Sequence, residues 1–459
     1  MTDPNVSTQA PMKAPVIRLL RSFQKMGEEG SEESRLFQEI RSLYSTLSEQ
    51  EKEQLFRSLI HEIEVSKEEI NPLLDRMRAD PQGDPDWPRL VSDLRDRIHS
   101  PRLNIFRKIS HQPGGLKFLL DFRGDLLSAR RFSTADLRPL DYDIVLLFEL
   151  WFQDGFLFLE EITLDSSYRQ IEIIKNSDLV HPMTSIEEMG RRLGRDRRCF
   201  ALYHRLMPVE PVVFIEVALT KGIVRHISQI IGGPDLQEKP GEPDTAIFYS
   251  INNTQEGLAG LRLGKMLIGR VVDYLRKERE DITTFATLSP LPGFWRRYLK
   301  PVLEGKDQAF LLKSGEIQGF FSGRQMKKIL DSLGPEGEEG KRFNEALLLM
   351  LSREDWGRDK DLRKVLQDPL LKLAYFYISR EKSREGKTLN PVANFHLENG
   401  ATVSKKNLNF LGNPSPRGLR DSCGIMVNYI YTAGWFTQIR SSLRRLEKVE
   451  MRGLFSRQR

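Results

Sequence analysis

One serine and one histidine occupy settings suited to acid–base chemistry. Ser289 lies in the segment LSPLPGF, directly after an expected strand over residues 282–288, where two prolines stiffen the chain so that it cannot run on as sheet. His396 alternates with apolar neighbours, so we expect it on one face of a strand over residues 390–397. A fixed hydroxyl can orient a substrate, and an imidazole, with an ordinary pKa of about 6.5, can transfer a proton.

Both residues also have purely structural interpretations. A serine at the end of a strand is often a turn residue or a helix N-cap. A histidine among apolar neighbours is often a core residue with satisfied hydrogen bonds. The local sequence leaves these alternatives open.

A glycine-rich turn is the third candidate. Gly257, Gly260 and Gly264 lie between an expected strand over residues 245–251 and an expected helix over residues 261–276. Glycines let the backbone approach a bulky anion, and the first N–H groups of a helix are unpaired at the positive end of its dipole. A diphosphate fits such a turn, although the spacing matches neither of the common nucleotide-binding glycine motifs. Glycines at this kind of turn are also frequently structural.

Metal and prosthetic-group chemistry has no support in the sequence. The two cysteines, Cys199 and Cys423, form no metal-binding pair, and no cluster of ligand residues has zinc spacing. No lysine lies in a cofactor-linking motif, so we expect no metal and no cofactor. Two cysteines cannot build a disulfide framework, which indicates a reducing compartment.

The elements that position these residues divide the chain into two domains. Residues 1–15 are polar and are expected to form a flexible tail. Over residues 16–174 apolar side chains recur every three or four positions, which predicts a helical domain that packs or oligomerises without chemistry. Residues 175–459 mix strands and helices, with a mostly helical insertion at about 300–387. We expect strands over residues 199–206, 211–219, 245–251, 282–288, 390–397 and 425–431, with Asn399-Gly400 as a hairpin turn between the last two.

Composition indicates a soluble globular protein. The 459 residues are 39% hydrophobic and 29% charged, which excludes a wholly disordered or disulfide-stapled chain. The net charge of +6 comes mainly from residues 440–459, which hold seven Lys or Arg against two Glu. We therefore expect no general binding to nucleic acid. We also expect no membrane span, because no run of about 18 apolar residues occurs, and a cytoplasmic location, because no secretory signal is recognised.

Four motifs together resemble the malonyl-CoA decarboxylase family. They are AIFYSINNTQEGLAGLRLG at residues 246–264, LSPLPGF at 288–294, NPVANFHLENGA at 390–401 and SCGIMVNY at 422–429. The likeness covers most of the second half, including HPM at 181–183 and RRCF at 197–200. The helical first half matches in character more than in motif.

The resemblance implies an α+β protein: a helical oligomerisation domain followed by a catalytic domain with the GNAT-like fold of acyl-CoA N-acyltransferases, assembled as a homotetramer. It implies that Ser289 is the proton acceptor and His396 the proton donor. It also assigns a CoA-phosphate loop, whose glycine spacing departs from the acetyltransferase form R/Q-x-x-G-x-G/A. The residues of that loop are Ala259, Gly260, Leu261, Arg262, Leu263, Gly264 and Lys265.

The implied reaction converts malonyl-CoA to acetyl-CoA and CO2 through a thioester enolate. The thioester carbonyl delocalises the charge left by CO2, so no metal, biotin or imine is required, and CoA is part of the substrate. Two alternatives stay open: an acyltransferase of the same superfamily, and a non-enzymatic scaffold whose basic tail, from Arg444 on, binds RNA or membrane.

Overall fold

The computed structural model describes most of the chain. Contacts between residues divide it into two compact units, one comprising Met1–Glu160, Leu202–Val213 and Asn253–Leu263, and the other Glu161–Ala201, Phe214–Asn252 and Gly264–Arg459. The basic tail lies outside the described residues. Those residues are 13–30, 32–79, 86–194, 196–231, 242–331, 339–353 (339–342 by their backbone only), 355–383 and 386–432.

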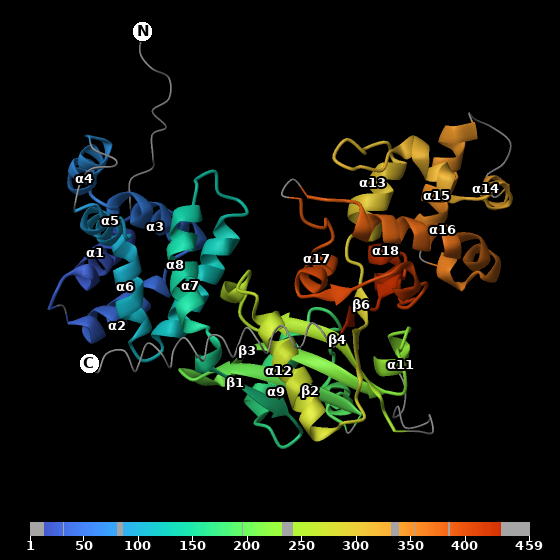
Figure 1. The fold of residues 1–459 in the computed structure, drawn as a ribbon, viewed down its shortest axis with the longest axis horizontal. Coiled ribbons are helices and arrows are strands. Elements are labelled where there is room, and N and C mark those ends of the chain that lie inside the picture. The colour runs from blue at the N-terminus through green and yellow to red at the C-terminus, as the bar shows by residue number, and fades with distance from the viewer. Residues whose placement is uncertain are drawn as a thin grey trace, which may run out of the picture. The chain divides into compact units, whose positions relative to one another are not determined.

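Helices dominate the first unit, as the apolar periodicity predicts. They form a bundle, drawn in blue to teal in Figure 1, in which Phe122 packs against the rings of Phe23, Tyr44 and Phe56 at centroid distances of 5.0–6.1 Å. The first helix begins at Ala14, inside the expected flexible tail. The unit's helices among the described residues are α1 (Ala14–Gly27), α2 (Glu33–Tyr44), α3 (Glu49–Glu62), α4 (Lys67–Ala79), α5 (Trp87–Arg97), α6 (Pro101–Ser110), α7 (Gly115–Ala129) and α8 (Arg138–Trp151).

The expectation of helix throughout residues 16–174 is wrong at one place. Residues Leu157–Ile162 form strand β1, the edge of the large sheet. The short helical turn Asp154–Phe156 and the glycine within it separate this strand from α8. The sequence LFLEEI then continues as a strand, and its backbone pairs with β2 (Arg197–His204).

The mixed sheet has seven strands in the order β1-β2-β3-β4-β5-β10-β7. Its long central strands are buried almost throughout, which matches their β-branched and aromatic composition. The stretch expected to be a helical insertion contains α13 (Lys300–Leu303), α14 (Gly323–Leu330), α15 (Glu339–Ser352) and α16 (Lys360–Ser379). The remaining strands are β2 (Arg197–His204), β3 (Met207–Thr220), β4 (Thr245–Asn253), β5 (Thr284–Thr287), β7 (Ala401–Thr402) and β10 (Ile430–Tyr431), and the other helices are α9 (Tyr168–Ser177), α10 (Ile186–Arg191), α11 (Ser228–Ile231), α12 (Leu263–Glu278), α17 (Pro391–Glu398) and α18 (Pro416–Ser422).

The parallel strands β4 and β5 part just before Ser289. Their pairing ends at Phe248 opposite Thr287, and the N–H of Leu288 donates a last bond to the Phe248 carbonyl. Beyond this point the chain enters β6 (Ser289–Pro290). This strand belongs to a second, three-stranded sheet, in which β9 (Met426–Val427) lies between β6 and β8 (Leu408–Asn409). The chain therefore does run on as sheet at Ser289, contrary to the expectation, because a different partner strand is available there.

Two expected strands near the C-terminus are also different. The expected strand over residues 390–397 is instead helix α17 (Pro391–Glu398), because Asn390 caps it and Pro391 occupies its first turn. Consequently Asn399-Gly400 is no hairpin turn but the end of this helix, with Gly400 at φ +81°. Residues 425–431 divide into β9 (Met426–Val427) in the small sheet and β10 in the large one.

Candidate active site

The structure brings Ser289 and His396 into hydrogen-bond contact. The Ser289 Oγ lies 3.1 Å from His396 Nε2, although 107 positions separate them in the chain. Ser289 is 6% exposed and His396 4% exposed, so the contact is shielded from water. The structure therefore unites the two residues that the sequence singled out for acid–base chemistry.

A chain of hydrogen bonds sets the tautomer of His396. The Thr287 hydroxyl lies 3.4 Å from the Val427 carbonyl, to which it can only donate, so it accepts from Ser289 Oγ at 3.0 Å. With its proton turned to Thr287, Ser289 accepts from His396 Nε2–H. The other ring nitrogen, Nδ1, then accepts from the Tyr431 hydroxyl at 2.9 Å. These hydrogen bonds require a neutral imidazole with its proton on Nε2.

Aromatic rings surround His396 and make its environment poorly polar. Its ring stacks on Tyr429 at a centroid distance of 4.7 Å and meets the edge of Phe395 at 5.0 Å. Burial disfavours the charged imidazolium and lowers the pKa of His396 to about 3. Burial therefore favours the neutral ring at physiological pH.

Two buried asparagines hold the segments of the site together. Asn390 accepts from the N–H of Ala393 with its side-chain oxygen, which caps α17, and donates to the Pro292 carbonyl at 3.0 Å. Asn428 donates to the carbonyls of Thr287 and Val224 at 2.6 and 3.0 Å. These two side chains thereby connect the segments carrying Ser289, His396 and Tyr431. Replacing either with an apolar side chain would leave buried backbone groups unpaired and reduce stability.

The comparisons with known proteins agree with these motifs. The family model of the malonyl-CoA decarboxylase C-terminal domain matches residues 155–440, and that of the N-terminal domain matches residues 63–152. The chain belongs to the malonyl-CoA decarboxylase family. The two-part α+β organisation, a helical region followed by a mixed-sheet region, is confirmed with it.

Relatives of this family are similar over much of the chain. It is 36% identical over 345 residues to the mitochondrial malonyl-CoA decarboxylase of Anser anser anser and 37% over 334 residues to that of Rattus norvegicus, which is 73% and 71% of this chain. The matches span 66% and 64% of those relatives, just under two thirds of their length. Its fold is similar to the crystal structures of the malonyl-CoA decarboxylases of Rhodopseudomonas palustris (TM-score 0.75, 30% identity, 95% of this chain and 97% of that one) and Agrobacterium vitis (TM-score 0.73, 30% identity, 91% and 92%).

The glycine turn of this family member is described in two parts. Residues 259–263 belong to the first unit, where Arg123 of α7 donates to the carbonyls of Gly257 and Ala259. Gly264 and Lys265 begin the part of α12 in the second unit, and there a Cβ on Gly264 would lie only 2.6 Å from the ring of Phe395. Gly264 thus approaches the neighbour of His396.

The backbone of this turn is unusual at two of the expected loop residues. Gly260 has φ +86°, with open space where a Cβ would stand, and Arg262 has φ +55° without being glycine. A non-glycine residue in the left-handed region costs of order 1 kcal/mol or more. The turn is therefore held in a defined conformation rather than in the one the chain would prefer locally.

A cavity of about 830 Å³ adjoins the strand that carries Ser289. Pro290, which follows Ser289, and Met426, its partner in β9, both line the cavity. Val392, one helical turn before His396, lines it too, as do the cationic side chains of Arg358 and Arg417. Glu188, Arg192 and Asp421 line it as well, so this cavity beside the Ser289–His396 pair has charged side chains of both signs.

The sequence analysis missed Thr287, Asn428 and Tyr431. Asn428 lies in the SCGIMVNY motif and Thr287 directly precedes LSPLPGF, but the sequence indicates no role for either residue. Tyr431 lies two residues beyond the last motif. Its signal would have been the alternation of Tyr429 and Tyr431 around one residue, which places both rings on the same side of an extended segment.

The described residues contain no group of three or more His, Cys, Asp or Glu side chains able to hold a metal ion. Cys199 and Cys423 are both free and buried, and burial raises the pKa of each thiol. Within the described ranges, no helix combines the length and the apolar character needed to cross a bilayer.

Proposed function

We propose that this chain decarboxylates malonyl-CoA to acetyl-CoA and CO2. The observation that carries the proposal is the 3.1 Å contact between Ser289 Oγ and His396 Nε2 at the point where β4 and β5 part. Membership of the family supports the reaction type. The roles of the individual residues below are inferred from their geometry and chemistry.

The first step breaks the bond between the α-carbon and the carboxylate. Its electron pair moves into the thioester to form an enolate, and CO2 leaves. This is easiest when the carboxylate stands perpendicular to the thioester plane, because the breaking bond then overlaps the carbonyl π system. When substrate binds, the Ser289 hydroxyl turns its proton from Thr287 to the carboxylate and so orients it, while its oxygen still accepts from His396 Nε2–H.

The second step returns a proton to the α-carbon. The net reaction consumes one proton, which we assign to His396. Burial alone keeps the ring neutral. The malonyl carboxylate adds a negative charge within a shielded space, which favours the imidazolium and raises its pKa. Substrate binding thereby favours the protonated form of His396. Transfer of this proton to the enolate carbon restores the neutral ring, which later takes up another proton from solvent.

The glycine turn supplies the place for the CoA diphosphate in this proposal. Residues 259–265 precede and open α12, whose first N–H groups are available to an anion. Past Phe248, residues 249–253 of β4 continue without pairing to β5, and such a strand edge suits a chain that contains amides, as CoA does. The proposal includes the GNAT-like assignment, supported by the order strand, glycine turn, helix and parallel strand from β4 to β5.

The test is release of CO2 from malonyl-CoA by the purified chain with no acyl acceptor present. A decarboxylase produces CO2 and acetyl-CoA in equal amounts. An acyltransferase of the same superfamily instead requires an amine and gives no CO2 in its absence. A preparation that folds but releases no CO2 above the uncatalysed rate rejects the proposal.

Assembly and location complete the proposal. We propose a homotetramer, as the family resemblance implies, with no nucleic-acid or membrane partner and no cofactor besides the CoA of the substrate. We propose a cytoplasmic location, whereas the goose and rat relatives are named mitochondrial. Sedimentation equilibrium tests the assembly, and fractionation of the source cells tests the location.

A further inference from the structure

A second cavity, of about 570 Å³, lies at β8 (Leu408–Asn409), the strand of the small sheet that does not pair with β6. We call it the basic cavity and define it by Arg225, Arg363, Lys405, Lys406, Asn409 and Phe410. Its described lining comes from residues 225–226, 363–371 and 405–411, and it includes no residue of the glycine turn or of LSPLPGF. It is therefore separate from the groups assigned to the acyl-CoA substrate.

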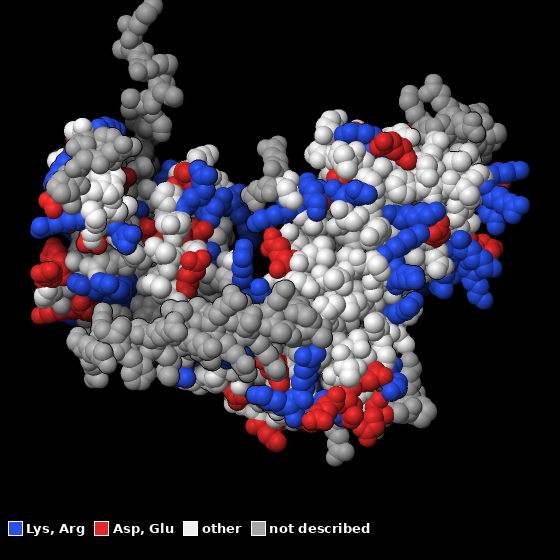
Figure 2. All heavy atoms as spheres, in the orientation of Figure 1, with Lys and Arg blue, Asp and Glu red and all other residues white. Residues whose placement is uncertain are grey.

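The basic cavity has a strong positive charge. Four Lys or Arg side chains line it and no Asp or Glu does, among the residues described. Asp368 partly compensates the charge of Lys405, with which it pairs at 3.2 Å, but it also pairs with Lys372 at 2.6 Å. Arg225 and Lys406 have no ion-pair or hydrogen-bond partner for their side chains in the described part of the chain. Figure 2 shows Lys and Arg gathered on the face over α14 and α16. Such a cavity favours an anion with more than one charge.

Asn409 lines this cavity and contains a buried, unsatisfied acceptor. Its amide nitrogen donates to Asn428 Oδ1 at 2.7 Å, while its own Oδ1 has no partner among the described residues. The orientation is fixed, because the Asn428 nitrogen donates to two carbonyls and so leaves only an oxygen facing Asn409. Asn409 is 4% exposed. A buried, unpaired oxygen costs stability, so this amide is held in place at the expense of the fold.

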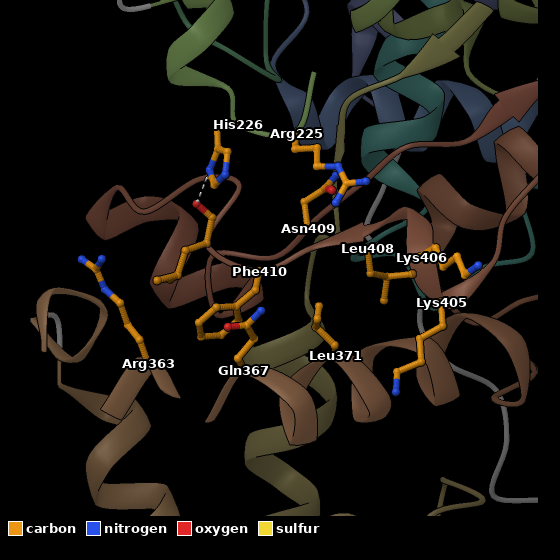
Figure 3. A pocket seen from close by; sticks show the side chains of 11 residues that line it. Arg225, His226, Arg363, Gln367, Leu371, Lys405, Lys406, Leu408, Asn409 and Phe410 are labelled. Carbon is orange, nitrogen blue, oxygen red and sulfur yellow. Dashed lines mark hydrogen bonds between the residues drawn. The ribbon is translucent and has the colours of Figure 1, made fainter. Parts of the chain in front are cut away.

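One wall of the cavity suits a flat ring. Arg363, Gln367 and Leu371 follow one another at intervals of four on α16, so they share one face of that helix. Figure 3 shows Phe410 beside Gln367 and, on the other side of the view, Arg225 pointing toward Asn409. An aromatic face next to an amide and a guanidinium is the chemistry that recognises a nitrogen heterocycle.

We propose that the basic cavity binds a nucleotide-class anion, a planar hydrogen-bonding ring joined to a phosphate, as a ligand separate from the acyl-CoA substrate. The phosphate pairs with Arg225 and Lys406, for which Arg supplies a fork of donors and Lys a point charge. The ring packs on Phe410, beside Gln367. The cavity volume falls in the range of small-molecule sites, which favours a free nucleotide over a longer polyanion.

The test uses calorimetric titration of the full chain with AMP, adenosine and ribose 5-phosphate. Adenosine lacks only the phosphate and ribose 5-phosphate lacks only the base. We expect AMP to bind at least tenfold more tightly than either, because both halves of the ligand have partners. Equal affinity for AMP and adenosine, or for AMP and ribose 5-phosphate, overturns the proposal.

Variants locate the binding. The double variant Arg225→Glu, Lys406→Glu changes two exposed side chains and should weaken AMP binding at least tenfold with an unchanged melting temperature. Lys328→Glu, an exposed lysine on α14 outside the cavity, is the matched control and should change affinity less than twofold. Equal losses in both variants would mean a diffuse charge effect and reject the site.

Competition with CoA separates this proposal from the proposed function. If saturating CoA leaves AMP binding intact, the two sites are distinct, as proposed. If CoA displaces AMP stoichiometrically, the basic cavity is part of the substrate site and the inference fails while the decarboxylase assignment stands. If the chain binds AMP but releases no CO2 from malonyl-CoA, the decarboxylase assignment fails while the inference about the basic cavity stands.

Discussion

His396 carries one exchangeable proton, and its surroundings decide when that proton is available. We predict that His396→Asn lowers the turnover number for CO2 release by about 10²–10⁴-fold, the range of a lost general acid. Asparagine retains a hydrogen-bonding group at a similar position but cannot deliver a proton to carbon. Turnover within threefold of wild type, with an unchanged circular dichroism spectrum, would remove His396 from the mechanism.

Tyr431 acts through His396 and is a positioning residue. Its hydroxyl donates to Nδ1 and so places the proton of the ring on Nε2, toward Ser289. Tyr431→Phe removes one hydrogen bond of about 1–1.5 kcal/mol, and we predict a roughly tenfold lower kcat with little change in KM. The pH profile of kcat should shift as well, because the removed bond is to the titrating ring.

Tyr429 provides the matched control for this substitution. It stacks on the same imidazole, but its hydroxyl has no partner among the described residues. Tyr429→Phe keeps the stacking ring and should leave kcat within about twofold of wild type. Equal losses in the two variants would show that packing against the ring, and not the hydrogen bond from Tyr431, sustains turnover.

At the scale of elements, helix α17 shows where the sequence analysis succeeded and where it did not. His396 was correctly identified as a residue in a constrained setting, yet a strand was expected around it. The apolar alternation at residues 395–397 is short, while Asn390-Pro391 is a helix N-terminus signal. The capping signal prevailed because it also satisfies the buried amide of Asn390 through the Pro292 carbonyl, a contact that no local pattern reveals.

The packing of α17 against the start of α12 leads to a prediction about Gly264. A Cβ there would lie 2.6 Å from Phe395 Cζ, and the displaced ring touches the edge of His396. Gly264→Ala should therefore destabilise the fold by about 1–3 kcal/mol through overpacking, with a loss of roughly tenfold in kcat/KM. Adding Phe395→Leu in the same chain should restore part of the lost stability and part of the lost kcat/KM. A double-mutant cycle of melting temperature and activity measures this.

Gly260 separates crowding from backbone strain in this experiment. No heavy atom lies within 4 Å of a Cβ built on it, but its φ is +86°. Gly260→Ala should cost about 1 kcal/mol through the left-handed conformation. Phe395→Leu should not rescue it. Rescue of both glycine variants, or of neither, would contradict the assigned contact between Gly264 and Phe395.

At the scale of the whole molecule, the two-part organisation and the long strands followed from periodicity and composition. The parting of β4 from β5 did not, because it depends on β6 finding β9, a segment more than a hundred residues away. Short strands of two residues, such as β6, β9 and β10, have no periodicity to detect. Their pairing depends instead on side chains such as Asn428, which bonds backbone groups in two other segments.

The buried histidines make the stability of the folded chain depend on pH. Burial lowers the pKa of His396 to about 3 and that of His181 to about 4, whereas an unfolded histidine has a pKa near 6.5. Between these values the unfolded chain binds more protons, so acidification from pH 8 to pH 5 destabilises the fold. Glu216 changes the stability in the opposite direction. Burial raises its pKa, so the folded chain binds this proton more tightly than the unfolded chain does, and acidification stabilises the fold through this group.

A comparison of wild type with His396→Asn isolates one of these groups, because His181 and Glu216 are common to both chains. Keeping His396 neutral at pH 5 costs the wild-type fold about 2 kcal/mol relative to pH 8, and the variant is spared this cost. We therefore predict that the urea midpoint of the variant rises relative to wild type as the pH falls from 8 to 5. His61→Asn, at an exposed position, should give a curve parallel to wild type. If the His396→Asn curve is also parallel to wild type, the imidazole is hydrated or charged in the folded chain, and the shielded acid on which the catalytic proposal depends does not exist.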